Sequence, residues 1–491
     1  MELLPPSALV VRLCKALETE EVVYCHWKSN AAINRSASGD NDLDLLVKRS
    51  DIQHFREILL RLGFKECLGN TVKQLPGVQD FFGYDPQADK FIHVHAHYQL
   101  IFGHDLSKNY HLPIEEPYLE SSQLCDLFKV PAPEFELVVF VIRMIIKHST
   151  WDTILNREGT LSATEKQELT YLEAKADHAK VAEILKKHLP FIDIGLFDEC
   201  LRALRPGYPL MKRIRAGWRL QDQLKAHARR PHMQDLLLKL WRWISLVFQW
   251  RVLKKRIRLR LANGGVMIVI VGGDGAGKTT TVGELYTWLS PHFDTRKIHM
   301  GKPSWSKTTI AVRGLIKIGN ILHLFPFEKA PMRFGEGQET MKFPGFPWLI
   351  WQVCAARDRL LAYKRARRFA SNGGIVICDR YPIQQIKYMD SPNASIRMSN
   401  RVRDHWLVKF LIGLETKYYP QILLPELLIV LRVDPEIAVQ RKQEESELSV
   451  RARSTEIWEF NWKETIAHVI EADQPKEAVL SEIKCLVWSV L

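Results

Sequence analysis

The stretch VGGDGAGKTTTV, residues 271–282, decides the fold of the second half of this chain. Its glycines and its Gly-Lys-Thr ending meet the pattern of a phosphate-binding loop. The β-branched run VMIVIV, residues 266–271, is typical of a buried parallel strand, and TTVGELYTWL, residues 280–289, predicts a helix. The glycines allow successive backbone N–H groups to face one anion at the helix N-terminus. The stretch therefore predicts a nucleotide-binding unit with strand, loop and helix in that order.

Two side chains of this loop and one acid downstream have predicted chemical roles. Lys278 is expected to reach the outer phosphates of a nucleotide, and the hydroxyl of Thr279 to ligate Mg²⁺. GGIVICDRY, residues 373–381, predicts a second buried strand that ends in Asp379. Ligands bind beyond the carboxyl ends of parallel strands, so this acid is expected at the same site.

A basic segment follows the third predicted strand, ELLIVLRVD, residues 426–434. PEIAVQRKQEESELSVRARS, residues 435–454, places four basic side chains around a polar stretch: Arg441, Lys442, Arg451 and Arg453. The segment is either a mobile lid over phosphates or a solvated charged helix. Its place after the loop and the Asp-Arg-Tyr strand favours the lid.

From Val266 to the C-terminus, the chain resembles the thymidylate kinase family. The matching segments are GGDGAGKTTT, AARDRLLAYKRARRFASNGGIVICDRY, LLIVLRVDPEIAVQRK and EADQPKEAVLSEI, with a tyrosine seven residues after Tyr381. The resemblance implies an ATP-dependent, Mg²⁺-using kinase whose acceptor is a nucleoside monophosphate or another small phosphate ester. Thymidylate is the leading candidate. The resemblance also makes a dimer possible.

The same resemblance implies roles for individual residues. ATP would lie against the loop residues Gly272, Gly273, Asp274, Gly275, Ala276, Gly277, Lys278, Thr279 and Thr280, with Mg²⁺ at Thr279 and Asp379. The acceptor's sugar hydroxyl would face Asp274, its phosphate Arg380 and its base Arg359, with Tyr381 and Tyr388 also in the substrate site. The family places a catalytic arginine in the loop or in the lid. The loop of this chain has Gly275 and no arginine. The catalytic arginine must therefore be Arg451 or Arg453 of the lid, acting beside Lys278 and Asp379.

Departures from the family pattern fall where the acceptor is expected. Gly301-Lys302-Pro303 replaces an Arg-Glu-Pro segment, and Gln384-Gln385 stands where small hydroxyl residues are usual. ATP use is therefore better supported than thymidylate as acceptor. The alternative is a nucleotide-binding regulatory or scaffold protein of a surface-polysaccharide system, with degenerate kinase and nucleotidyltransferase domains. A third possibility is a two-step enzyme whose N-terminal unit uses the kinase product.

An Asp-x-Asp pair marks the N-terminal unit. In YCHWKSNAAINRSASGDNDLDLLV, residues 24–47, Asp42 and Asp44 alternate on a predicted strand and point to one face, as two carboxylates sharing a divalent metal must. Residues 22–112 resemble the nucleotidyltransferase superfamily, particularly its polysaccharide-locus branch. The third carboxylate is expected in KFIHVHAHYQL, residues 90–100, where His93, His95 and His97 stand instead. These imidazoles either bind a metal or are hydrogen-bonded strand residues.

Charge and length indicate the domain organisation. The 491 residues predict two folded units and a connector: an α+β nucleotidyltransferase-like domain with a helical extension over 1–200, a basic helical connector over 201–264, and an α/β P-loop kinase domain with a parallel sheet and flanking helices over 265–491. Residues 205–260 contain sixteen Lys/Arg and two acids, against a net charge of +13 for the whole chain. The rest is nearly neutral.

The connector contains LLLKLWRWISLVFQWRVLKKRIRLRL, residues 236–261, which lacks Gly and Pro and predicts one long helix. It is either a linker helix packed on the domains or a helix that contacts an anionic membrane surface. No base-reading module is present, so no nucleic acid partner is expected. The eight scattered cysteines, the poor secretory signal and the lack of a long apolar run predict a cytoplasmic protein, with peripheral contact at the inner membrane face as an option.

Overall fold

The computed structural model describes residues 5–69, 75, 77–103, 106–148, 161–251, 258–322, 345–383, 386, 405–442 and 445–491. The chain divides into two compact units, residues 1–257 and 258–491. Each unit has its own sheet and its own buried core.

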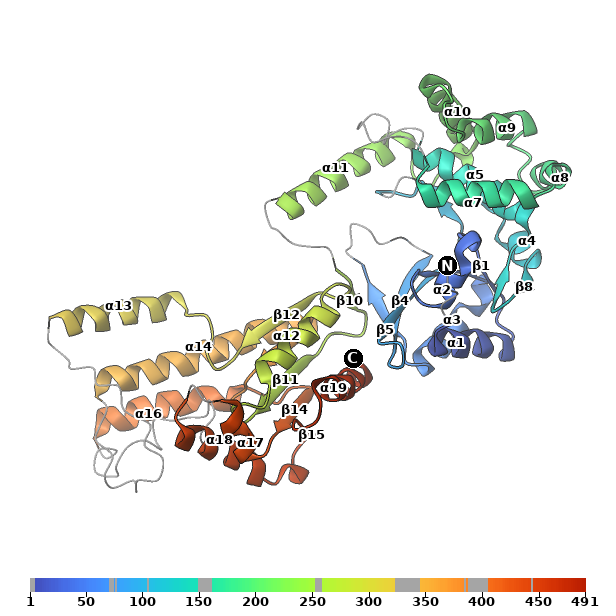
Figure 1. Cartoon of the computed structure of the whole chain (residues 1–491). Helices are drawn as coiled ribbons and strands as arrows, with labels where there is room; N and C mark the ends of the chain where they lie inside the picture. Colours follow the sequence, from blue (N-terminus) through green and yellow to red (C-terminus); the bar gives the residue numbers. More distant parts are fainter. Residues whose placement is uncertain are drawn as a thin grey trace. The chain divides into compact units, whose positions relative to one another are not determined.

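The C-terminal unit is built on a parallel sheet with strand order β12-β13-β11-β14-β15 (Figure 1). Every neighbouring pair in this sheet is parallel. The strands are β11 (Met267–Gly272), β12 (Thr295–His299), β13 (Ile375–Asp379), β14 (Leu427–Arg432) and β15 (Ala467–Glu471). The central strand β11 is buried at every position, as the run of β-branched residues predicted. The α/β class with a parallel sheet is therefore confirmed.

Helices stand between the strands in sequence, as the crossovers of a parallel sheet require. They are α12 (Lys278–Leu289), α13 (Lys307–Ile321), α14 (Phe346–Ser371), α16 (Trp406–Tyr418), α17 (Pro435–Arg441) and α18 (Glu447–Glu459), with the short turns η5 (Tyr419–Gln421) and η6 (Trp462–Glu464). A last helix, α19 (Lys476–Val490), follows β15. The order of strands places β11 between β13 and β14, so the loop after β11 opens at the middle of the sheet edge.

The N-terminal unit begins with a mixed sheet in which β1-β2-β5-β4-β3 lie in that order. Only the β2/β5 pair is parallel among these neighbours. The strands are β1 (Tyr24–His26), β2 (Leu43–Val47), β3 (Lys65–Leu68), β4 (Val78–Asp85) and β5 (Lys90–His97). Helices α1 (Ala8–Thr19) and α3 (Ile52–Arg61) share a core with the sheet. The short elements are η1 (Asn30–Ala32), α2 (Ile33–Ala37), η2 (Arg49–Asp51), β6 (Ile101–Phe102), β7 (Tyr110–His111), α4 (Glu115–Glu120), β8 (Gln123–Cys125) and β9 (Phe128–Val130).

A helical part completes this unit around the apolar helix α5 (Pro133–His148). Its other helices are α7 (Ala163–Lys175), α8 (His178–His188), α9 (Ile194–Ala203), α10 (Leu210–Gln223), η3 (Lys225–His227) and α11 (His232–Arg251). Helices α9 and α10 pack on α5, so much of the basic segment shares a core with the N-terminal unit.

The long helix expected over residues 236–261 does not reach its predicted end: α11 is described as far as Arg251, residues 252–257 lie outside the described residues, and residues 258–261 are not helical. Arg260 and Leu261 form the short strand β10. The amide of Leu259 donates to the His292 carbonyl at 3.1 Å, and the amide of Asp294 donates to the Leu259 carbonyl at 2.8 Å. These tertiary hydrogen bonds override helix propensity at this end of the segment. Among the described helices, none is long and apolar enough to cross a membrane.

Candidate functional site

The glycine-rich loop of the C-terminal unit joins the end of β11 to the start of α12. Gly275 and Gly277 have φ angles of 79° and 82°, in the left-handed region that favours glycine. A Cβ added to Gly275 would lie 2.9 Å from the backbone oxygen of Ala438. Ala276 is buried, and Thr280 is exposed in the first turn of α12. Backbone conformation and close packing therefore both require glycine in this loop.

Lys278 is the first residue of α12 and folds back over the loop. Its Nζ donates to the Gly273 carbonyl at 2.6 Å and lies 3.9 Å from Asp274 Oδ1. Burial lowers the pKa of Lys278 to about 8, although the nearby Asp274 acts to raise it. A phosphate that drew this ammonium from the carbonyl would stabilise its charged form.

Thr279 and Asp379 meet across the sheet edge, as their positions predicted. The Thr279 hydroxyl donates to Asp379 Oδ2 at 3.2 Å. Asp379 Oδ1 is buried and has no hydrogen-bond partner among the described residues. A hydroxyl and a carboxylate oxygen are ligands that Mg²⁺ prefers, so this pair fits the ion that the loop pattern implies.

Asp274 is the acidic centre of the loop and is 3% exposed. Arg453 of α18 forms an ion pair with it, and Arg380 Nη2 lies 3.8 Å from its Oδ1. Burial acts to raise the pKa of Asp274, but Lys278, Arg453 and Arg380 together lower it. Three cations thus surround the carboxylate of Asp274 at this loop, as a site that binds phosphates needs.

The two arginines of the lid segment have different partners. Arg453 contacts Asp274 and Glu445, whereas Arg451 pairs with Glu436 and Glu447. Arg451 is 40% exposed at its side chain and Arg453 20%. The structure thus brings Arg453 to the loop and leaves Arg451 on the outer side of α18.

The predicted acceptor residues are held by the protein's own groups. Arg359 of α14 donates to the Met300 carbonyl at 3.3 Å and to the Tyr419 hydroxyl at 2.8 Å. Tyr381 is 2% exposed, and its hydroxyl donates to the Leu423 carbonyl at 2.5 Å, which gives the ring a packing role in the core. Tyr388 and the Gln384-Gln385 pair lie outside the described residues.

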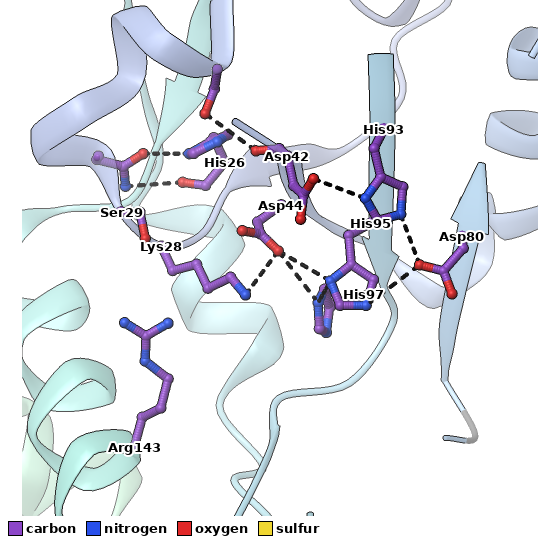
Figure 2. Close-up of polar contacts among 12 residues, drawn as sticks. His26, Lys28, Ser29, Asp42, Asp44, Asp80, His93, His95, His97 and Arg143 are labelled. Atoms are coloured by element: carbon purple, nitrogen blue, oxygen red, sulfur yellow. Dashed lines mark hydrogen bonds and ion pairs between the residues drawn. The ribbon is translucent and has the colours of Figure 1, made fainter. Parts of the chain in front are cut away.

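A second polar cluster lies in the N-terminal unit, where β2 and β5 run in parallel with Asp44 opposite His95. Asp44 Oδ1 lies 2.8 Å from Lys28 Nζ, 3.2 Å from His95 Nδ1 and 3.9 Å from His97 Nε2. Figure 2 shows this carboxylate between the lysine and the two imidazoles. Burial acts to raise the pKa of Asp44, but Lys28 and the two histidines hold it well below its usual range.

The remaining members of the cluster form a chain of contacts beside Asp44. His93 Nδ1 lies 2.9 Å from Asp42 Oδ1, and its Nε2 lies 2.9 Å from Asp80 Oδ1 (Figure 2). Burial acts to lower the pKa of His93, but the two carboxylates raise it to about 9. Asp42 precedes β2, whereas Asp44 lies within it, and the two carboxylates contact different histidines.

Asp80 of β4 is the acid that sequence reasoning missed. It lies directly opposite His95 across the β4/β5 hairpin. The sequence contains a feature that could have located Asp80, namely the turn at residues 86–89. This turn pairs Asp85 with Lys90, and in an antiparallel hairpin that first pair sets the register of the others, including Asp80 with His95. The third carboxylate expected near the Asp-x-Asp pair thus comes from β4, while β5 contributes imidazoles.

A cavity of about 730 Å³ opens beside this cluster. Asp44 and Lys28 line it, together with Lys108, Arg143 and Lys147. The Nε of Arg143 is buried without a hydrogen-bond partner among the described residues, while its Nη2 lies 3.3 Å from Glu168. The lining combines several cations with the aromatic rings of Trp27 and Phe102. The lining also carries the carboxylates of Asp40, Asp44, Glu165 and Glu168, and ion pairs join Lys28 to Asp44, Arg143 to Glu168 and Lys147 to Glu165. Such a cavity suits a polar ligand with an apolar part.

Helix α11 presents an apolar stripe to solvent within its own unit. The stripe comprises large side chains at helical spacing, each 44% to 66% exposed: Met233, Leu237, Leu240, Trp241, Ile244 and Phe248. Two basic side chains of this helix are engaged within the unit, since Arg242 donates to the Leu106 carbonyl and Lys239 pairs with Asp235.

The fold and the loop define the C-terminal unit as a P-loop domain of the α/β class. No family model matches the sequence. The chain is similar to the Escherichia coli protein named "uncharacterized ATP-binding protein YghR", in strains K12 and CFT073, with 25% identity over 221 residues, which is 44% of this chain and 84% of that protein. It also has a likeness to a solved deoxyadenosine kinase from M. mycoides with bound dATP, with 16% identity and a TM-score of 0.26 over 45% of this chain and 98% of the other. At this TM-score the likeness supports no functional inference.

Proposed function

We propose that the C-terminal unit transfers the γ-phosphoryl group of ATP to a nucleoside monophosphate or another small phosphate ester, with thymidylate as the leading candidate. The observation that carries the proposal is the meeting of Lys278, Thr279 and Asp379 around the glycine loop. The similarity to a protein named as ATP-binding supports the nucleotide.

Catalysis would come from positioning and charge rather than from a covalent intermediate. Lys278 would leave the Gly273 carbonyl and contact the outer phosphates. Thr279 and Asp379 would hold Mg²⁺, which supplies charge neutralisation at the phosphates when bound. Arg453 already lies at the loop, so it is the lid arginine that we assign to stabilising the transferring charge.

The acceptor would bind near Arg380 and the loop after β12. Arg380 has φ of 66°, a left-handed conformation that costs energy for a residue other than glycine. Its Nη2 lies 3.8 Å from Asp274, which keeps the guanidinium at the carboxyl edge of the sheet. Arg359 holds the backbone of Met300 and Gly301, so it would shape the wall of the acceptor site through this loop.

The test is ADP release with Mg-ATP across a panel of nucleoside monophosphates and sugar phosphates. Lys278→Ala is expected to abolish turnover, whereas Lys364→Ala, an exposed change on α14, serves as the matched control. Turnover with thymidylate alone would support the leading candidate, and turnover with another acceptor would define the substrate. ATP binding without turnover on any acceptor would instead support the regulatory or scaffold alternative. Turnover that persists in Lys278→Ala would refute the site.

A further inference from the structure

We propose that Asp44, His95 and His97 of the N-terminal unit form a binding site for a tetrahedral divalent transition metal, with Zn²⁺ as the first candidate. Their ligand atoms, Asp44 Oδ1, His95 Nδ1 and His97 Nε2, lie within 4.8 Å of one another. The three separations are 3.2, 3.3 and 3.9 Å. Ligand bonds of about 2.0–2.1 Å at tetrahedral angles place neighbouring ligand atoms about 3.3 Å apart. The three atoms thus already approximate one face of a tetrahedron.

The strands explain why this geometry forms. His95 and His97 alternate on β5 and point to the same face, and β2 is the parallel neighbour that brings Asp44 opposite His95. Asp44 and His97 are buried, which limits the freedom of these two side chains, whereas His95 is half-buried. His97 is 2% exposed and lies edge-on to Trp27 at 4.9 Å between ring centroids, which fixes its orientation.

A second layer of carboxylates supports the proposed ligands. With His95 Nδ1 facing the metal position, its Nε2 faces Asp80 Oδ1 at 3.9 Å. Asp80 is in turn held by His93, which also contacts Asp42 (Figure 2). At 3.9 Å this contact is within ion-pair range but is longer than a hydrogen bond, so the proposal requires Asp80 to close on His95 when the metal binds. A carboxylate that accepts the other ring N–H of a ligating histidine orients the ring and raises its basicity. Asp80 is therefore a positioning residue in this proposal.

The ligand set differs from the Asp42/Asp44 pair that the sequence suggested. Asp42 contacts His93 at 2.9 Å and is 58% exposed at its side chain, so it belongs to the second layer. Two imidazoles and one carboxylate favour Zn²⁺ and its neighbours over Mg²⁺, which prefers oxygen ligands. Asp44 also lines the 730 Å³ cavity, so a fourth ligand can approach the metal from that side. Three protein ligands and an accessible fourth position are typical of zinc sites that act on a ligand.

Lys28 supplies a check on this geometry. Its Nζ lies 2.8 Å from the same Asp44 oxygen that we assign to the metal. An ammonium and a metal ion compete for this oxygen, so Lys28→Met is expected to tighten metal binding. If the ion pair between Lys28 and Asp44 only stabilises the fold, Lys28→Met should not increase the affinity for the metal.

The experiment uses the full chain, stripped of metal with a chelator and titrated with Zn²⁺ or Co²⁺ in excess Mg²⁺, so that oxygen-preferring sites are filled. Elemental analysis gives the stoichiometry, and the visible absorption of tetrahedral Co²⁺ reports the geometry. We expect one ion per chain. His95→Asn and His97→Asn should each abolish stoichiometric binding, and Asp80→Asn should weaken it about 10–100-fold. His54→Asn, a change outside the cluster, is the matched control.

Several outcomes would overturn the proposal. One is a wild-type protein that is folded by circular dichroism but binds neither ion. Another is a His95→Asn or His97→Asn variant that keeps full binding. If Asp42→Asn abolishes binding as completely as Asp44→Asn, the Asp-x-Asp pair and not the Asp-His-His set holds the ion. If His97→Asn does not fold, two other variants still test the proposal. His95→Asn, at the more exposed histidine, should abolish metal binding, and Lys28→Met should tighten it. These readouts do not depend on kinase activity.

Discussion

The stability of the N-terminal unit is expected to fall with rising pH because of one buried carboxyl group, Glu136. It lies on α5, is 4% exposed, and its Oε1 has no hydrogen-bond partner among the described residues. Burial raises the pKa of Glu136 from 4.5 to about 7, although bonds from Asn30 act to lower it and Glu168 acts to raise it. Between pH 4.5 and about 7, Glu136 therefore keeps its proton in the folded chain but has lost it in the unfolded chain.

The sign and size follow from this pKa. A folded-state pKa above the unfolded value gives stability that is complete below pH 4.5 and is lost as the pH rises to about 7. A rise of this size corresponds to about 3 kcal/mol, since each pH unit contributes about 1.4 kcal/mol. Glu136→Gln removes the titration. The free energy of unfolding of the wild type, minus that of the variant, should thus fall by about 3 kcal/mol between pH 4.5 and pH 8.

Urea unfolding followed by circular dichroism at several pH values measures this difference, because the other titrating groups cancel between the two proteins. Glu134→Gln, on the same helix, controls for the change from glutamate to glutamine. A wild-type to Glu136→Gln difference that is flat with pH, or that grows as the pH rises, would refute the reasoning. Glu136 is also linked to the cavity wall, because the η1 turn that contains its partner Asn30 contributes to that wall.

Three further changes test the C-terminal unit and α11. Arg453→Ala should lower kcat on the order of 10³-fold in steady-state kinetics, because Arg453 contacts the loop. Arg451→Ala should have a much smaller effect, because Arg451 pairs with glutamates away from the loop. Equal losses of kcat in the two variants would contradict this assignment. Gly275→Ala should weaken ATP binding in calorimetry, since its φ of 79° and the nearby backbone oxygen exclude a Cβ, whereas Gly283→Ala in α12, with open space around it, should leave affinity unchanged. We also propose that the exposed stripe of α11 contacts an anionic membrane, helped by the basic run that follows it, so Trp241→Glu should reduce cosedimentation with anionic vesicles. Equal binding to neutral vesicles would argue against the charge contribution.

The phosphate loop could be predicted from sequence because its determinants are contiguous. Strand, glycines, Lys278 and helix start follow one another within about twenty residues, and backbone geometry fixes their relation. Asp379 was also predictable, since a parallel sheet brings strand ends to one edge. In contrast, Asp80 reaches His95 only through strand pairing, and its place depends on the register of a hairpin.

The end of the long basic helix shows a different limit. The segment has good helix formers throughout, but residues 259–261 are held by hydrogen bonds to Asp294, His292 and Gly373. These partners are 30 or more residues away in the sequence, and no local pattern announces them. Local propensity therefore predicted the existence of α11 but not the short strand β10 at residues 260–261.

The lid arginines show how a structure resolves an alternative that sequence leaves open. Arg451 and Arg453 are two residues apart on α18, and at about 100° per residue they point to opposite sides of the helix. Only one of them can face the loop for a given rotation of α18. Ser454 fixes that rotation, because it is 1% exposed and packs so closely on the loop that a Cβ on Gly273 would lie 2.7 Å from its Oγ. With Ser454 against the loop, its neighbour Arg453 reaches Asp274, and Arg451 is left to pair with the glutamates outside.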